Sequence, residues 1–141
     1  MGIEIQYRDF VHLKATGNRL LIYYHALKSL QKQPVSVNRE LSEKLIEIRP
    51  KRRSMKLEQC FNEVLAELPD GVIIRDFDVM FNPDYQVDVL KILTDERRHK
   101  NYSAIWPGEE KDGKLIYSVE DYPDYKTYEI ENYDVTCIIG Q

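Results

Sequence analysis

The sequence predicts an α/β fold in which a parallel sheet flanked by helices is followed by an antiparallel C-terminal extension. Up to about residue 100, short apolar runs alternate with stretches of helical periodicity. The runs are apolar at consecutive positions, as are strands that are buried on both faces of a parallel sheet. Beyond residue 100, strand-like runs follow one another without a helix between them, which favours antiparallel pairing.

The first elements are a strand over 20–24, Leu-Leu-Ile-Tyr-Tyr, and a short helix over 26–33. Pro34 ends that helix, because the residue before a proline avoids helical backbone. A second strand is expected over 35–37, and Asn38 is expected to cap the next helix. The apolar residues of that helix fall largely on one side: Leu41, Leu45, Ile46 and Ile48.

Ser54 is expected to cap the strongest helix of the chain. Its apolar residues recur at i, i+3, i+4 and i+7, a stripe suited to packing on a sheet. The stripe consists of Leu57, Cys60, Phe61, Val64, Leu65 and Leu68. A turn at 69–71 leads into a strand over 72–74, and Asn82-Pro83 is expected to start a helix with Val87, Leu90, Ile92 and Leu93 inside it. Further strands are expected over 102–106, 115–117, 126–130 and 135–139.

Composition indicates one globular domain over residues 1–141. The chain has 20 Lys and Arg against 24 Asp and Glu, a net charge of −4, with 43% hydrophobic and 31% charged residues. These values exclude a disordered chain, and the acidity argues against extensive coating of nucleic acid. Cys60 and Cys137 form no CxxC pair, and no apolar run is long enough to span a membrane. We therefore expect a cytoplasmic protein without a membrane anchor.

The sequence lacks an intact phosphate-binding loop. Such a loop follows the first strand and needs glycines, a Lys and a Ser or Thr. After Tyr24 the chain reads His-Ala-Leu-Lys-Ser, so Lys28-Ser29 resembles the end of the motif but no glycine precedes it. The three histidines show no zinc-ligand spacing, and neither cysteine lies in a nucleophile motif. We expect no catalytic residue, no bound metal and no cofactor, with weak binding of magnesium-ATP left open as an alternative.

Asp76 and Asp78 follow the apolar run 72–74, where magnesium-dependent NTPases hold their metal with a strand-end carboxylate. The alternative is that both residues simply end the strand or cap the next helix. Arg75 adds to that alternative, because its charge could replace that of a metal ion.

Two clusters of cations are candidate contact sites. Arg97 and Arg98 could contact a phosphate, or could simply be favourable charges at a helix C-terminus. Lys51, Arg52 and Arg53 belong to a basic loop over 49–53 that could contact nucleic acid or an acidic partner, or could be solvated. Trp106 and the tyrosines over 121–125 could form an aromatic contact surface, although core packing explains them equally.

Taken in order, these segments resemble the small P-loop protein of type 3 bacteriophage-exclusion (BREX) defence systems. The resemblance runs from about residue 18 to residue 130. The matching segments are 20–24, 38–45, the basic stretch ending at Arg53, 74–83, 89–93, 97–98, 106–109, 115–117 and 122–125. The chain departs from the family where a glycine-rich loop ending in Gly-Lys-Thr should follow the first strand.

The resemblance implies a P-loop NTPase-like domain with a degenerate phosphate loop. It also implies an accessory, non-catalytic role in phage defence, in which the protein docks to partners such as the large ATPase of the system. Two alternatives remain open. One is a weak magnesium-dependent NTPase or nuclease that uses Asp76 and Asp78. The other is a nucleic-acid-binding module that uses Arg52, Arg53, Arg97 and Arg98.

Overall fold

The computed structural model describes residues 1–10, 19–24 and 33–140. The strands are β1 (Ile3–Gln6), β2 (Leu20–Tyr23), β3 (Val35–Ser36), β4 (Val72–Arg75), β5 (Tyr102–Ile105), β6 (Glu109–Lys111), β7 (Lys114–Tyr117), β8 (Lys126–Glu129) and β9 (Val135–Ile139). The helices are α1 (Tyr7–Phe10), α2 (Asn38–Ile46), α3 (Arg53–Ala66) and α4 (Val89–Glu96), with 3₁₀ turns η1 (Pro50–Arg52), η2 (Asp78–Phe81) and η3 (Ile130–Asn132).

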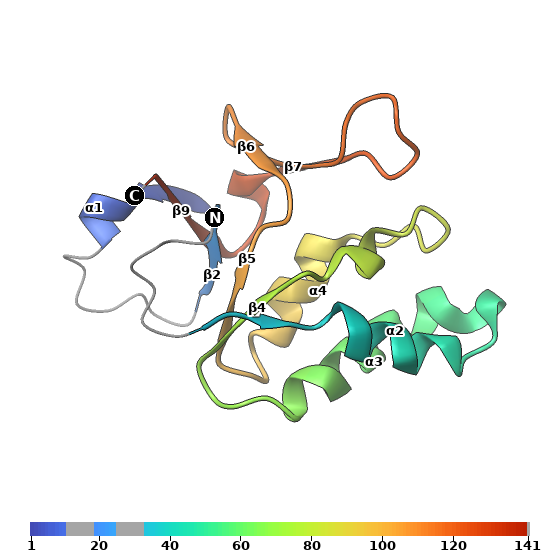
Figure 1. Ribbon diagram of the computed structural model, residues 1–141. Coiled ribbons are helices and arrows are strands. Elements are labelled where there is room, and N and C mark those ends of the chain that lie inside the picture. The colour runs from blue at the N-terminus through green and yellow to red at the C-terminus, as the bar shows by residue number, and fades with distance from the viewer. Residues whose placement is uncertain (11–18, 25–32, 141) are drawn as a thin grey trace.

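The strands form two sheets (Figure 1). A six-stranded sheet has the order β1-β9-β2-β5-β4-β3, and all of its neighbours pair in parallel. A three-stranded sheet, β6-β7-β8, is antiparallel. The predicted α/β class, with a parallel sheet and an antiparallel C-terminal part, is confirmed. No helix among the described residues is long and apolar enough to cross a bilayer.

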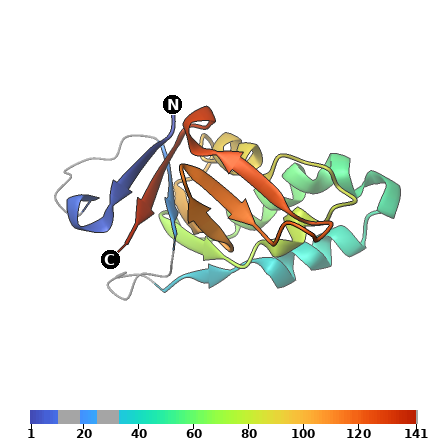
Figure 2. The ribbon, with the colours of Figure 1, turned by 90° about the horizontal axis from the view of Figure 1, so that it is seen from above.

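The position of β9 corrects the predicted topology. The last strand was expected in the antiparallel extension, but it lies between β1 and β2 in the parallel sheet (Figure 2). The physical reason is its burial: Val135, Thr136, Cys137 and Ile138 are all buried, so this strand needs cover on both faces. Strands β1 and β6 were not predicted, and residues 26–32 of the helix expected over 26–33 lie outside the described residues.

The first two predicted helix caps are wrong. Asn38 is the first residue of α2, after Val37, and its side-chain oxygen accepts a hydrogen bond from the Val79 N–H at 3.1 Å. Asn38 therefore joins α2 to η2 instead of capping its own helix. Ser54 lies inside α3, which begins at Arg53. The apolar stripe of α3 is confirmed, because its members over 57–65 are buried.

The third helix also starts elsewhere than predicted. The chain forms the turn η2 before Asn82, whose side-chain oxygen accepts a hydrogen bond from the Asp84 N–H at 2.9 Å. Helix α4 begins only at Val89, where Asp88 accepts a hydrogen bond from the Lys91 N–H at 3.0 Å. Asn82-Pro83 thus makes a local turn, and the capping function falls to Asp88.

Most of the hydrophobic core lies on one face of the parallel sheet. Leu20, Ile22 and Ile74 point to this face and are fully buried against α2, α3 and α4. The other face carries a smaller cluster in which Tyr7 and Phe10 of α1 pack beside Tyr23, Ile73, Ile105 and Ile138. The three long helices therefore cover one side of the sheet, as Figure 1 shows.

An aromatic cluster joins the two sheets. The Phe81 ring stacks on Tyr117 of β7 with centroids 3.8 Å apart, and it meets Trp106 edge-on at 5.6 Å. The Trp106 indole donates a hydrogen bond to the Ile116 carbonyl at 2.9 Å. Gly108 passes so close to that carbonyl that a Cβ would lie 2.0 Å from its oxygen, so only glycine fits there. Trp106 is thus a core residue, whereas Tyr122 is 63% exposed.

Candidate functional site

The strand order points to the carboxyl edge of the parallel sheet as the place for a ligand. From β3 to β4 to β5 to β9 the chain steps in one direction across the sheet. From β2 the next strand is β3, three places away in the opposite direction. In parallel α/β sheets, ligands bind beyond the carboxyl ends of the strands where the order reverses. That point is the carboxyl end of β2 and its neighbour β5.

Asp76 follows β4 at this edge and has a left-handed backbone, with a φ of 56°. Asp tolerates this conformation better than most residues, because its short side chain can bond locally. The Arg75 guanidinium forms an ion pair with the Asp76 carboxylate at 3.2 Å, and both side chains are about half exposed, at 52% and 45%. The strand-end carboxylate is therefore already paired with a cation.

Asp78 is the first residue of η2, and a side chain of the antiparallel sheet holds its carboxylate. The Tyr117 hydroxyl donates a hydrogen bond to the Asp78 carboxylate at 3.0 Å. Burial, followed by this bond and the charge of Asp78, raises the pKa of Tyr117, so the phenol remains a donor at neutral pH. Within the described ranges, no three His, Cys, Asp or Glu side chains come together as a metal site.

The structure separates Arg97 and Arg98 from these carboxylates. Arg97 follows the last residue of α4, and its backbone N–H bonds to the Leu93 and Asp95 carbonyls. Helix α4 leads into the start of β5, so both arginines lie at the amino edge of the sheet, opposite Asp76 and Asp78. Arg98 is exposed. The two cations therefore cannot share a ligand with the carboxyl edge, although a separate contact stays a prediction.

The basic loop divides into two kinds of residue. The Arg53 guanidinium donates to the Ile48 carbonyl at 2.9 Å and to the Ile46 carbonyl at 3.5 Å, so it fastens the end of α2 to the start of α3. Lys51 and Arg52 are exposed and form no hydrogen bond or ion pair through their side chains. Arg53 therefore shapes the loop, while Lys51 and Arg52 are available for contacts.

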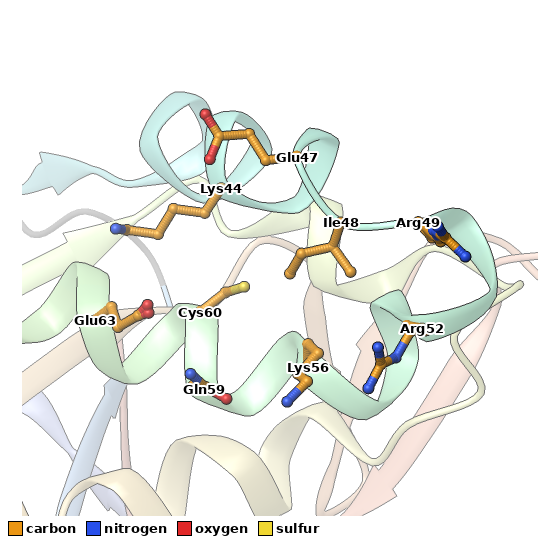
Figure 3. Close-up of a pocket in the computed structure, with 9 residues that line it drawn as sticks. All are labelled: Lys44, Glu47, Ile48, Arg49, Arg52, Lys56, Gln59, Cys60 and Glu63. Atoms are coloured by element: carbon orange, nitrogen blue, oxygen red, sulfur yellow. The ribbon is translucent and has the colours of Figure 1, made fainter.

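A pocket of about 490 Å³ lies between α2 and α3 (Figure 3). It is lined by Lys44, Glu47, Ile48, Arg49, Arg52, Lys56, Gln59, Cys60 and Glu63. The sequence prediction included the basic loop but missed Lys44, Lys56 and Glu63. The available signal was the spacing of Arg52, Lys56, Gln59 and Glu63, which places polar side chains on one side of α3 beside its apolar stripe.

Lys28 and Ser29, which resemble the end of a phosphate loop, lie outside the described residues. The chain matches no protein-family model, no curated protein and no solved structure in the comparisons with known proteins.

Proposed function

We propose that this chain is an accessory, non-catalytic domain that acts by docking to a protein partner. In this proposal the fold is P-loop NTPase-like with a degenerate phosphate loop, and the protein serves a type 3 BREX phage-defence system. The large ATPase of such a system is the proposed partner. Cys60 and Cys137 are both free thiols, which agrees with a reducing, cytoplasmic location.

The observation that carries the proposal is the state of the two strand-end carboxylates. Asp76 is paired with Arg75 at 3.2 Å, and Asp78 accepts the Tyr117 hydroxyl at 3.0 Å. A carboxylate that holds magnesium must direct an oxygen at the ion, and the charge of Arg75 opposes a divalent cation beside Asp76. The absence of glycine between Tyr24 and Ser29 supports the same conclusion, because phosphate loops grip through closely approaching backbone.

A thermal-shift titration with magnesium-ATP and magnesium-ADP tests this proposal. A ligand at about 100 times its dissociation constant adds about 2.7 kcal/mol of stability. We expect no change in melting temperature up to several millimolar nucleotide. A rise in melting temperature that disappears in Asp76→Asn would show nucleotide binding that depends on the strand-end carboxylate and would contradict the degenerate nucleotide site. Co-purification with the large ATPase of the defence system, absent for an unrelated bait of equal charge, tests the docking role.

A second function has one specific observation in its favour. Asp76 combines a left-handed backbone with a half-exposed carboxylate at the carboxyl edge, and strained residues gather at active sites. A weak magnesium-dependent NTPase or nuclease would use Asp76 and Asp78 there. It would show metal-dependent turnover that Asp76→Asn and Asp78→Asn each abolish, whereas Asp84→Asn, an exposed turn residue, would leave turnover unchanged.

A further inference from the structure

The pocket between α2 and α3 concentrates unpaired positive charge. Four cations line it: Lys44 from α2, Arg49 from the connecting loop, Arg52 from η1 and Lys56 from α3. Each is a described residue, and none forms an ion pair or a side-chain hydrogen bond. By contrast, Arg39 and Arg75 elsewhere on the surface are paired with carboxylates. The pocket thus holds four unpaired cations against two carboxylates, Glu47 and Glu63, and so has an excess of positive charge.

The floor of the pocket is apolar. Figure 3 shows Ile48 and the sulfur of Cys60 between the two helices, with cations around them. Cys60 is only 4% exposed, and burial and the charge of Glu63 raise the pKa of its thiol. The charges of Lys44 and Lys56, which also line the pocket, act on the pKa of the same thiol in the opposite direction. At neutral pH the floor is therefore uncharged.

An exposed apolar side chain borders the same surface. Met55 is 70% exposed and lies one turn before Gln59 on α3. Methionine is flexible and polarisable, and it adapts to varied apolar partners at binding surfaces. A ligand seated in the pocket would meet an uncharged floor with cations around it, and a ligand that extends beyond Gln59 along α3 would reach Met55.

We propose that the pocket between α2 and α3 binds an acidic peptide segment of a partner protein, with an apolar side chain on Ile48 and Cys60 and carboxylates opposite Lys44, Arg49, Arg52 and Lys56. This inference deepens the proposed docking function and rests on it. Arg53 supports the site indirectly, because its hydrogen bonds to the Ile46 and Ile48 carbonyls fix the chain segment next to Arg49.

Charge favours a peptide over nucleic acid as the occupant. Glu47 and Glu63 also line the pocket, and the whole chain has a net charge of −4. Duplex DNA presents one negative charge about every 1.7 Å along its axis, so its phosphates would meet these carboxylates as well as the cations. A peptide can place its acidic residues opposite the cations and neutral residues opposite Glu47 and Glu63. Only a peptide also supplies an apolar side chain for the floor.

Fluorescence anisotropy with a short labelled peptide that repeats Asp-Glu-Leu tests the inference. The comparison probes are the same peptide with Asn and Gln in place of its acids, an Asp-Glu peptide without Leu, and a labelled DNA duplex. We expect the Asp-Glu-Leu peptide to bind with micromolar affinity and each comparison probe to bind at least about tenfold more weakly, a difference of about 1.4 kcal/mol.

The variant pair Arg52→Glu with Lys56→Glu should weaken peptide binding at least tenfold. The matched control, Arg8→Glu with Lys111→Glu, makes the same change in charge at two exposed cations outside the pocket and should stay within twofold of the unaltered protein. If the reversal unfolds the chain, Arg52→Gln with Lys56→Gln removes the same charges more gently. Circular dichroism checks the fold of each variant.

Three results would overturn the inference: no peptide binding up to about 1 mM, equal binding by the pocket variant, or tighter binding of DNA that the pocket variant loses. A thermal response to magnesium-ATP that requires Asp76, together with intact peptide binding at the pocket, would refute the proposed degenerate nucleotide site and leave this inference standing. No thermal response to magnesium-ATP, together with no peptide binding at the pocket, would refute only the inference about the pocket.

Discussion

The contact between the two sheets depends on Phe81, and its truncation should be costly. The Phe81 ring is 3% exposed and is enclosed by Tyr117 at 3.8 Å and Trp106 at 5.6 Å, measured between ring centroids. Truncating a buried phenylalanine to alanine costs about 3–5 kcal/mol, and each well-placed aromatic pair adds about 0.5–1.5 kcal/mol. We therefore expect Phe81→Ala to lower the free energy of unfolding by about 4 kcal/mol.

Urea denaturation followed by tryptophan fluorescence measures this loss directly. Trp106 is the single tryptophan of the chain and touches Phe81, so its emission reports on the cluster. At roughly 3 °C for each kcal/mol in a chain of this size, the melting temperature should fall by about 12 °C. The slope of the denaturation curve should not change, because the surface exposed on unfolding stays nearly constant.

Two milder variants test how the packing of this cluster contributes to stability. Phe81→Leu keeps most of the volume and should cost about 1–2 kcal/mol. Tyr128→Phe removes a hydroxyl that is buried without a hydrogen-bond partner in the structure, so stability should stay constant or rise by about 1 kcal/mol. A loss below about 1.5 kcal/mol in Phe81→Ala, or equal losses in Phe81→Ala and Phe81→Leu, would refute the view that this cluster couples the sheets.

Three further perturbations test the loop, the strand end and a pair of carboxyl groups. In urea denaturation, Arg53→Ala should lower the free energy of unfolding by about 1.5 kcal/mol, because its hydrogen bonds to two backbone carbonyls are lost. Arg52→Ala should change it by no more than about 0.5 kcal/mol. Equal losses would contradict the view that Arg53 shapes the loop while Arg52 is available for contacts. Asp76→Val should lower the free energy of unfolding by about 1–2 kcal/mol, because a branched side chain resists a φ of 56°. Asp76→Asn should lower it by at most about 1 kcal/mol, through the lost exposed ion pair with Arg75. If thermal melts show Asp76→Asn to be the less stable variant, the backbone at residue 76 is not strained. Burial and a hydrogen bond with Glu96 raise the pKa of Glu58 above 4.5, so its stabilising contribution is complete below that pH and is lost as pH rises through the raised value. Glu58→Gln should therefore raise the melting temperature at pH 7 but not near pH 4, and identical melts at pH 7 would contradict this.

Elements with a strong local pattern were predictable from the sequence. The stripe of α3 has apolar residues at every position that faces the sheet, and the run 72–74 is apolar at consecutive positions, so no distant residue was needed to assign either. Strand β1 is different. It has only four residues, with Ile3 47% exposed, and its partner Thr136 lies about 130 residues away in sequence. No local signal marks such a strand.

The helix starts show why capping residues mislead when they are considered alone. Asn38, Asn82 and Asp88 are all suitable caps by residue type. Only Asp88 caps a helix, since Asn38 is used by the Val79 N–H and Asn82 by the Asp84 N–H. The side chain goes to whichever donor the surrounding structure brings within reach. That choice is made by tertiary contacts, which a single sequence does not display.

The same limit applies to the candidate site. The sequence predicted that Asp76 and Asp78 end a strand, and they do follow β4. It also suggested that Arg75 could pair with Asp76, because the two residues are adjacent in the chain. It could not show that Tyr117, 39 residues beyond Asp78, donates to that carboxylate. The α2–α3 pocket was missed for a related reason: its lining comes from two helices and a loop, and only their packing brings the cations together.

The position of β9 has a consequence for the order in which the chain can fold. Strands β1 and β2 both pair with β9, which is synthesised long after them. Until residue 139 has left the ribosome, β1 has no partner in the sheet and one edge of β2 is open, and an unpaired edge invites association with other chains. We expect the helices α3 and α4 with β4 and β5 to pack first, because their contacts are closer in sequence. A nascent chain arrested before residue 135 would then expose the amino-terminal strands to chaperones, and its release would close the sheet in one late step.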